Sequence, residues 1–343
     1  MYYVSGELLT ENGFEKGYVC VENNVIVEVG QGDPPEKPAA EGYVTPTFFN
    51  AHTHLGDAFI GEKIGNLPRD LEKLVAPPDG LKHRLLAEAS DKEIIEGIVS
   101  SLGFMIKNGT FLFCDFREGG LRGLNLIKKA LSGLPVSPVL LSRPSNLVYD
   151  KGELDVLLDN SEGIGLSSIS DGDYDEIKKV ARHTKKRKKV FALHVSERYR
   201  EDIDKVLDLK PDFLVHMVYA TKDDLERVKD ENIPVVVCPR SNVFFNLKPN
   251  IELIREIGVA LVLGTDNAMV STPDVLEEVR WIKRRFKGFK VEELLDMVTY
   301  LPRKVFSLST PSFVEDSKAD FVVLDTKSLK PLFVSLAKGV ERV

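Results

Sequence analysis

Four of the six histidines lie where an apolar run of the sequence ends. His52 and His54 occur in "NAHTH", His194 in "FALHVSER" and His216 in "FLVHMV". A carboxylate, Asp266, ends the run "LVLGTD". Imidazole nitrogen and carboxylate oxygen together suit a divalent transition metal, zinc or iron above all. These residue types predict a metal site, provided that the fold brings the ends of the runs together.

The spacing of the first pair supports this prediction. Residues i and i+2 of a strand point to the same face, so His52 and His54 can offer two nitrogens to one point. His194 and Asp266 can complete the set from other strands. With one position left open, the ion binds water and lowers its pKa from about 15.7 towards 7, which yields hydroxide at neutral pH.

Each signal has an ordinary explanation when it is taken alone. An HxH pair on a strand surface is common, a buried His216 is more often a hydrogen-bonded core residue, and a strand-end aspartate such as Asp266 often caps a helix. The conjunction of all of them favours the metal site. Of the other two histidines, His183 lies in a charged helical segment and is expected to be structural, whereas His83 remains open.

The elements that must position these residues alternate along the chain. Amphipathic, charged segments separate most of eight short apolar runs, at 44–52, 110–116, 137–143, 163–170, 190–195, 213–218, 233–239 and 259–266. Eight strand–helix alternations predict an α/β fold, a (β/α)8 TIM barrel, whose chemistry lies at the carboxyl ends of the strands. A doubly wound sheet is the alternative, but it often carries a glycine-rich phosphate turn that this sequence lacks.

The two ends of the chain have strand texture without a helical period. We expect residues 1–45 and 308–343 to form one small composite β-domain, a β-sandwich, and residues 46–307 to form the barrel. The stretch 55–89 is too long for a simple connection after the first barrel strand, which predicts a lid or an active-site loop.

Composition excludes several classes of protein. Hydrophobic residues make up 43% of the chain and charged residues 29%, as in ordinary globular proteins. A net charge of −7 argues against a nucleic-acid partner. No apolar run approaches the roughly 20 residues that span a bilayer, and no signal peptide is evident. The three cysteines are far apart and form no CxxC motif, which predicts a reducing, cytoplasmic location.

With these residues in place, the sequence resembles the amidohydrolase superfamily over nearly its whole length. "PTFFNAHTH" is similar to the strand-1 metal motif, "LHVSE" to the strand-5 motif, "LVHM" to the strand-6 motif, and "CPRSN" and "LGTDNA" to the last two barrel strands. The resemblance is closest to the branch of cytosine deaminases, guanine deaminases and chlorohydrolases, which includes methylthioadenosine/S-adenosylhomocysteine deaminases.

The resemblance implies a role for each residue. His52, His54, His194 and Asp266 hold one metal ion, zinc or else iron, since the fourth strand, "GIGLSSIS", lacks the lysine of binuclear members. Asp266 also accepts a proton from the bound water. Glu197 protonates a substrate ring nitrogen, and His216 hydrogen-bonds the water or the developing alkoxide. The HxxE spacing of His194 and Glu197 matches deaminase-like members.

The implied function is a mononuclear metal-dependent hydrolase that deaminates an amino-substituted nitrogen heterocycle through metal-bound hydroxide. Hydrolysis of a ring amide, an imidazolone or a C–Cl bond is the alternative, and a non-catalytic metal-binding protein is a more distant one. Arg117, Arg143 and Asn242 are candidate contacts for a small-molecule substrate, although Arg117 and Glu118 could equally form an ion pair. A homodimer is an open alternative to a monomer, because dimers are common among similar proteins.

Overall fold

A computed structural model of the chain describes residues 1–77, 79–145, 148–336 and 339–341. The chain divides into two compact units, each assembled from separate stretches. The first comprises Met1–Phe49, Gly103–Leu112 and Asp274–Val343, and the second Asn50–Leu102 and Phe113–Pro273. These units are not the domains expected from the sequence, and the boundaries at 45/46 and 307/308 stay predictions.

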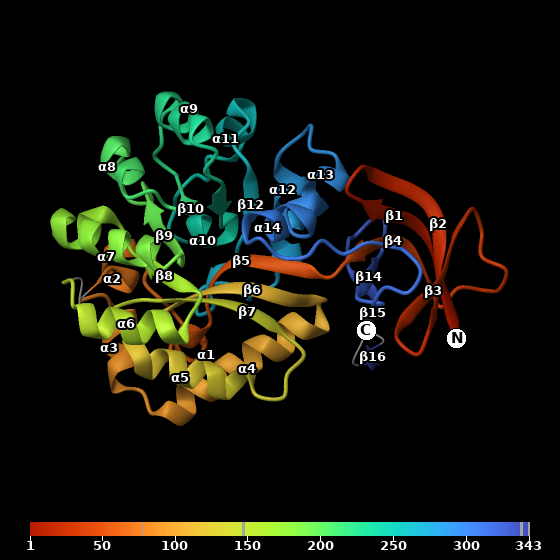
Figure 1. The fold of residues 1–343 in the computed structure, drawn as a ribbon, viewed down its shortest axis with the longest axis horizontal. Coiled ribbons are helices and arrows are strands. Elements are labelled where there is room, and N and C mark those ends of the chain that lie inside the picture. The colour runs from red at the N-terminus through yellow and green to blue at the C-terminus, as the bar shows by residue number, and fades with distance from the viewer. Residues whose placement is uncertain (78, 146–147, 337–338, 342–343) are drawn as a thin grey trace. The chain divides into compact units, whose positions relative to one another are not determined.

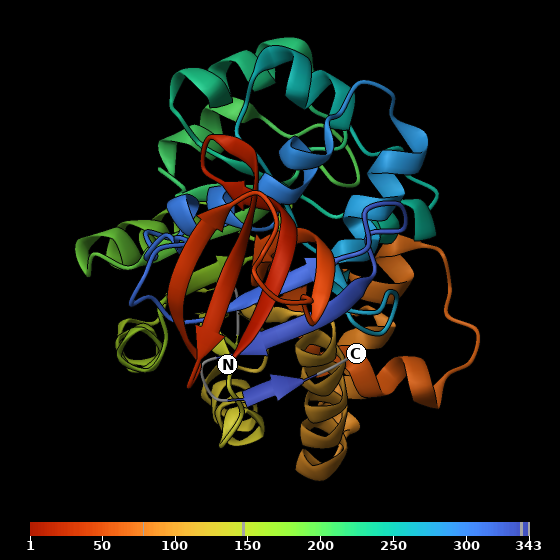
Figure 2. The same cartoon turned by 90° about the vertical axis from the view of Figure 1, so that its right-hand side faces the viewer.

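The first unit contains a seven-stranded sheet in the order β16-β15-β14-β4-β1-β2-β3. Its strands are β1 (Tyr2–Thr10), β2 (Gly13–Glu22), β3 (Val25–Gln31), β4 (Ala40–Pro46), β14 (Phe321–Leu324), β15 (Pro331–Leu336) and β16 (Gly339–Glu341). Figure 2 shows the red N-terminal strands beside the blue C-terminal ones, and β14 pairs with β4. The C-terminal tail therefore joins the N-terminal strands, as predicted. The described strands form one hydrogen-bonded sheet, and the β-sandwich stays a prediction.

Alternation along β2 shows why this sheet is stable. Val19 and Val21 belong to the buried cluster of one face, whereas Tyr18 and Cys20 pack with Tyr3 on the other. Successive side chains of a strand point to opposite faces, so a run of apolar residues covers both.

The second sheet has nine strands in the order β12-β11-β10-β9-β8-β7-β6-β5-β13. They are β5 (Phe48–His54), β6 (Thr110–Arg117), β7 (Ser137–Ser142), β8 (Gly163–Leu166), β9 (Val190–Val195), β10 (Phe213–His216), β11 (Val235–Val237), β12 (Leu261–Leu263) and β13 (Asp266–Asn267). A strand overlaps each of the eight predicted apolar runs. The registers from β7 to β12 are parallel, so the carboxyl ends of these strands share one edge.

The sheet curls because one continuous stretch of chain, β12 followed by β13, contributes a strand to each of its two edges. β12 pairs with β11, and β13, which follows at once, pairs with β5. Gly264 lies between them, and a Cβ there would stand 2.7 Å from Cβ of His52, so only glycine permits this approach. The result is a mixed α/β fold with a curled parallel sheet, consistent with the predicted TIM barrel.

Helices follow most strands of the curled sheet. They are η1 (Leu55–Asp57), α1 (Ala58–Lys63), α2 (Leu71–Val75), α3 (Leu81–Glu88), α4 (Asp91–Lys107), α5 (Gly120–Leu131), α6 (Lys151–Asn160), η2 (Ile169–Asp171), α7 (Tyr174–Lys186), α8 (Ile203–Asp208), α9 (Lys222–Asp230), α10 (Pro239–Phe244) and α11 (Ile251–Ile257). The first unit holds α12 (Val275–Arg285), α13 (Val291–Asp296) and α14 (Tyr300–Val305).

The amphipathic helix α7 illustrates how these helices pack. Its buried residues Ile177, Val180, Ala181 and Thr184 recur at helical spacing, and α7 packs on β8 and β9. Figure 1 shows α5, α6 and α7 on the outer side of the strands. In the part of the chain that the structure describes, none of the helices has the length and apolarity needed to cross a bilayer.

Candidate metal centre

Four side chains meet at the carboxyl edge of the curled sheet. Nε2 of His194 lies 3.2 Å from Nε2 of His52 and 3.4 Å from Nε2 of His54. Oδ1 of Asp266 lies 3.4 Å from Nε2 of His52 and 3.5 Å from Nε2 of His54. His52 and Asp266 are 0% and 2% exposed. The strand ends thus bring together the four residues predicted from the sequence.

These separations fit the dimensions of a metal site. Ligand atoms about 2.0–2.2 Å from a tetrahedral ion lie about 3.3–3.6 Å from one another. The four measured separations, 3.2–3.5 Å, are close to that range. Two imidazole lone pairs that face each other at such distances repel unless a cation or a proton lies between them. The donor set therefore fits a bound divalent ion.

In His194 and in His54, a neighbouring acceptor determines which of the two ring nitrogens is free to bind an ion. Nδ1 of His194 lies 2.8 Å from the carbonyl oxygen of Leu166, which can only accept, so Nδ1 carries the proton. Nδ1 of His54 lies 2.8 Å from Oε1 of Glu118, a charge contact that favours the proton on the same nitrogen. In both rings Nε2 keeps its lone pair and faces the cluster, the usual arrangement around a metal-binding histidine.

Burial favours the neutral form of three of the clustered histidines. It lowers the pKa of His52 to about 4 and that of His216 to about 3, and it moves the pKa of His194 well below its usual value. Burial also acts to raise the pKa of Asp266. The hydrogen bond from His52, together with the electrostatic interaction with His216 and His54, outweighs burial and holds that pKa well below its usual range. The pKa directions therefore favour neutral rings at His52 and His194 and an ionised carboxylate at Asp266.

Glu197 and His216 form a second pair beside the cluster. Nε2 of His216 lies 3.4 Å from Oε1 of Glu197, and Nδ2 of Asn242 lies 3.3 Å both from that oxygen and from Nδ1 of His216. Burial, followed by the charge of Asp266, raises the pKa of Glu197 well above its usual value. Burial therefore favours the protonated form of Glu197, next to an ionised aspartate.

His216 is close enough to the cluster to compete with His54 as a ligand. The ligand atoms of His52, His194, His216 and Asp266 all lie within 4.8 Å of one another. His54, however, makes the 3.4 Å and 3.5 Å contacts described above, whereas His216 lies against Glu197. Geometry alone thus gives five candidate ligands for four positions.

The backbone is strained where two of these side chains leave their strands. His216 has φ +78° and Asp266 has φ +62°, in the left-handed region that non-glycine residues rarely adopt. Oδ2 of Asp266 accepts a 2.5 Å hydrogen bond from Ser241, which fixes the carboxylate while Oδ1 faces the histidines. Such strain is typical of functional sites.

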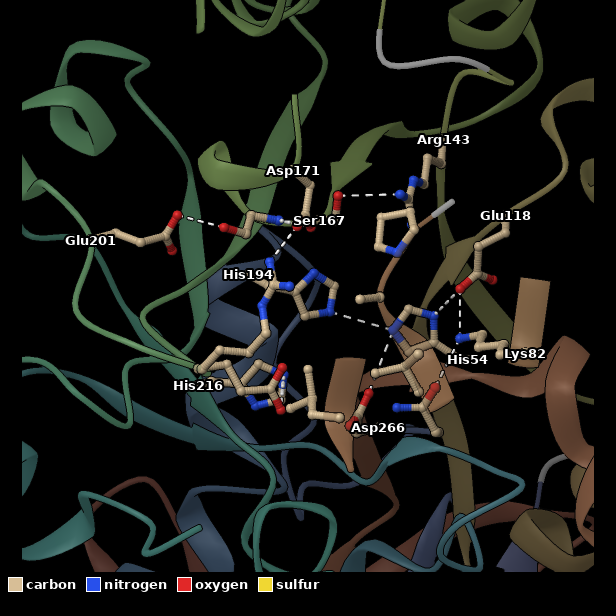
Figure 3. Close-up of a pocket in the computed structure, with 18 of the residues that line it drawn as sticks. His54, Lys82, Glu118, Arg143, Ser167, Asp171, His194, Glu201, His216 and Asp266 are labelled. Carbon is tan, nitrogen blue, oxygen red and sulfur yellow. Dashed lines mark hydrogen bonds and ion pairs between the residues drawn. The ribbon is translucent and has the colours of Figure 1, made fainter. Parts of the chain in front are cut away.

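A cavity opens on the cluster, and the 55–89 segment forms part of its wall. Leu71, Val75, Ala76, Pro77 and Lys82 line it from this segment, and Arg143, Asp171, Arg198 and Tyr199 line it elsewhere. Figure 3 shows Arg143 on the wall of the cavity. Nη2 of Arg143 donates to Ser167 at 3.2 Å, and none of the described residues holds a carboxylate within ion-pair distance of it.

The structure separates the three predicted substrate contacts. Arg143 lines the cavity, but Arg117 and Asn242 do not. Arg117 is 2% exposed and makes a 2.9 Å ion pair with Glu118. Asn242, 0% exposed, instead links Glu197 to His216.

Sequence reasoning missed Lys82 altogether. Its side chain is buried against Glu118 beside the cluster. A lysine in a segment expected from the sequence to be a lid or a loop gives no signal of burial before the fold is known. The two remaining histidines have local partners: His83 lies 3.0 Å from the carbonyl oxygen of Val75, and His183 lies 3.0 Å from Oδ1 of Asp155.

Comparison with known proteins agrees with the geometry. Residues 43–343 match the model of the amidohydrolase family. The chain belongs to this family. Its members bind a metal ion, and its relatives support a hydrolase that acts on carbon–nitrogen bonds.

Three similar proteins illustrate the range of the family. An uncharacterized protein of Methanocaldococcus jannaschii is 35% identical over 93% of this chain and 85% of its own length. A 5-methylthioadenosine/S-adenosylhomocysteine deaminase of Caldicellulosiruptor saccharolyticus is 26% identical over 94% of this chain and 83% of its own. The crystal structure of a Xanthomonas campestris adenosine deaminase with bound zinc has the same fold, with a TM-score of 0.76 at 16% identity, over 99% of this chain and 92% of that one.

Proposed function

We propose that this chain is a mononuclear metal-dependent aminohydrolase, which removes an amino group from a nitrogen heterocycle such as a nucleobase or a nucleoside. The observation that carries the proposal is geometric: the carboxyl group of Glu197 and the ring of His216 lie beside a buried set of three imidazoles and a carboxylate. Burial favours neutral rings at His52 and His194 and raises the pKa of Glu197, which favours its protonated form. A purely structural metal site has no need of a carboxylic acid 3.4 Å from His216.

The proposed ligands are His52, His54, His194 and Asp266. Three imidazoles and a carboxylate suit zinc best, with iron as the alternative. When bound, such an ion lowers the pKa of a water molecule from about 15.7 towards 7 and so supplies a nucleophile at neutral pH. The stretch of β8 and the residues after it, "GIGLSSIS", contains no lysine, and this supports a single metal.

The remaining residues handle protons. Asp266, ionised and held by Ser241, accepts a proton from the nucleophilic water. Glu197, protonated, donates one to a ring nitrogen, which makes the adjacent amino-bearing carbon electrophilic. His216 accepts or donates a hydrogen bond at the oxygen that develops negative charge, and Asn242 orients both Glu197 and His216.

Arg143 is the proposed substrate contact on the cavity wall. Its guanidinium lines the cavity with Ser167 as its hydrogen-bond partner, so it can bind a carbonyl, hydroxyl or anionic group of the substrate. The two other candidates act differently in this proposal. Arg117 holds the carboxylate of Glu118 through their ion pair, and Asn242 positions Glu197.

A substrate screen of the zinc-loaded protein tests the proposal, with ammonia release measured for the amino heterocycles and product formation followed by chromatography for the other compounds. The panel contains aminopurines, aminopyrimidines, their nucleosides and S-adenosylhomocysteine, together with ring amides and chlorinated triazines. Ammonia from at least one amino heterocycle is the expected result. Turnover of ring amides or chlorinated rings alone moves the function to the alternative hydrolysis, and stoichiometric zinc binding without turnover on any substrate supports a non-catalytic metal protein.

A further inference from the structure

A buried lysine lies next to the proposed metal site, against Glu118. Lys82, in α3, is only 2% exposed. Its Nζ lies 2.6 Å from Oε1 of Glu118 and 3.1 Å from Oδ2 of Asp57, and it donates a 2.8 Å hydrogen bond to Oδ1 of Asn267. Lysine is almost never fully buried unless it is paired, and here three oxygen atoms surround the ammonium.

The carboxylate of Glu118 connects this lysine to a proposed metal ligand. Oε1 of Glu118, which contacts Lys82, also lies 2.8 Å from Nδ1 of His54. Oε2 accepts a 2.9 Å hydrogen bond from Nη2 of Arg117. Figure 3 shows the three side chains in this order, with Glu118 between Lys82 and His54. The opposite nitrogen of His54 faces Asp266 and His194.

The charges of this group depend on Lys82. Asp57 and Glu118 are 0% and 8% exposed, so neither carboxylate is compensated by water. Burial acts to lower the pKa of Lys82, but Glu118 and Asp57 raise it above the ordinary value, and the ammonium stays charged. Removing it leaves two buried carboxylates with one cation fewer, and a buried charge without a partner is strongly destabilising.

We propose that Lys82 is a positioning residue of the metal site. Its ammonium fixes the carboxylate of Glu118, and this carboxylate orients the ring of His54 so that Nε2 faces the ion. The inference rests on the proposed function only in assuming that His54 binds a metal. It makes the 55–89 segment part of the metal site as well as of the cavity wall.

We call this path from Lys82 through Glu118 to His54 the relay. The zinc affinity of the Lys82→Met variant, measured by competition with a chromophoric chelator, tests it. The expected result is an affinity about 10–100-fold below that of the unmodified protein, the usual cost of losing a partner of a ligand. The cobalt-substituted variant should also show a changed visible spectrum. Lys63→Met is the matched control, because Lys63 lies in the same segment but is 52% exposed and pairs with Glu93 at 3.1 Å.

A folded Lys82→Met protein that melts at a lower temperature but keeps zinc affinity and cobalt spectrum overturns the relay, because its role is then only structural. Zinc that fails to bind even the unmodified protein overturns the proposed metal site and the relay together, so the two failures are distinguishable.

Glu118→Gln keeps the test decisive if Lys82→Met does not fold. The amide preserves size but not charge, and the relay predicts weaker zinc binding and an altered cobalt spectrum here too. Where both variants fold, the double variant should bind zinc no more weakly than the worse single one, because both changes interrupt one path. Unchanged zinc binding by Glu118→Gln, or fully additive losses, contradicts the relay.

Discussion

The sheet of the first unit and the strand ends of the second are both buried, yet their side chains are of opposite kinds. Val4, Val19 and Phe321 belong to an entirely apolar cluster in the first unit. In the second, His52 and Asp266 are equally inaccessible and carry polar atoms. Burial of apolar groups stabilises the fold, whereas buried polar groups cost free energy unless they are paired.

The polar region also contains atoms without partners. Nδ1 of His52 and Oδ1 of Asn242 are buried and make no hydrogen bond among the described residues. Native proteins rarely leave such atoms unpaired without a reason. We therefore expect the apolar cluster of the first unit to serve stability and the polar strand ends of the second unit to serve binding and catalysis. Each prediction below changes one of these two regions.

Removing a proposed ligand should have the largest effect. His194→Ala is expected to abolish zinc binding and lower turnover at least about a thousandfold, because the ion accounts for a shift of roughly nine units in the pKa of water. Metal analysis of the purified variant, together with its ammonia release, checks both effects. A variant that retains one zinc per chain and normal turnover would remove His194 from the ligand set.

Glu197→Gln should separate catalysis from metal binding. The amide cannot supply a proton, so we expect turnover to fall by about 10²–10⁴-fold while zinc content stays unchanged. Glu72→Gln is the control, since this glutamate is exposed on α2. Unimpaired deamination by Glu197→Gln would assign the acid role to another residue.

Phe321→Ala should act on the apolar region. This side chain is 0% exposed, and its truncation is expected to lower the free energy of unfolding by about 3–5 kcal/mol. Zinc affinity of the folded fraction should not change. Chemical denaturation and chelator competition measure the two quantities, and an equal loss in both would contradict the separation of the two regions. Phe313, only partly buried against the same cluster, gives the milder control.

Acid should weaken the metal-free protein through the polar region. His52 and His216 have pKa values of about 4 and 3 when folded, against about 6.5 in an unfolded chain. Below pH 6.5 the unfolded state binds more protons, so stability should decline as the pH falls from about 6.5 to about 3. Thermal unfolding of chelator-treated protein across this range tests it, and a flat profile would contradict the buried, neutral state of these rings.

Arg143→Met should have the smallest effect, confined to substrate binding. Loss of one charged hydrogen bond costs about 1.5–3 kcal/mol, so KM should rise roughly tenfold to a hundredfold with kcat little changed. Steady-state kinetics on the best substrate of the ammonia screen measures the split. A fall in kcat at constant KM would instead place Arg143 in the transition state.

The sequence by itself determined the residues that converge at the carboxyl edge of the sheet. Periodicity located the apolar runs, and parallel strands must end at one edge, so His54, His194 and Asp266 could be brought together without coordinates. It also predicted that the tail from 308 onwards joins the N-terminal strands.

Only the tertiary structure decided what surrounds those residues. It buried Lys82 against Glu118, turned Arg117 away from the cavity, and placed Asn242 between Glu197 and His216. Local patterns record the side chains that face a core, because those repeat with the period of a helix or a strand. The partner of a polar side chain depends instead on how segments far apart in the sequence pack, and no local pattern records that.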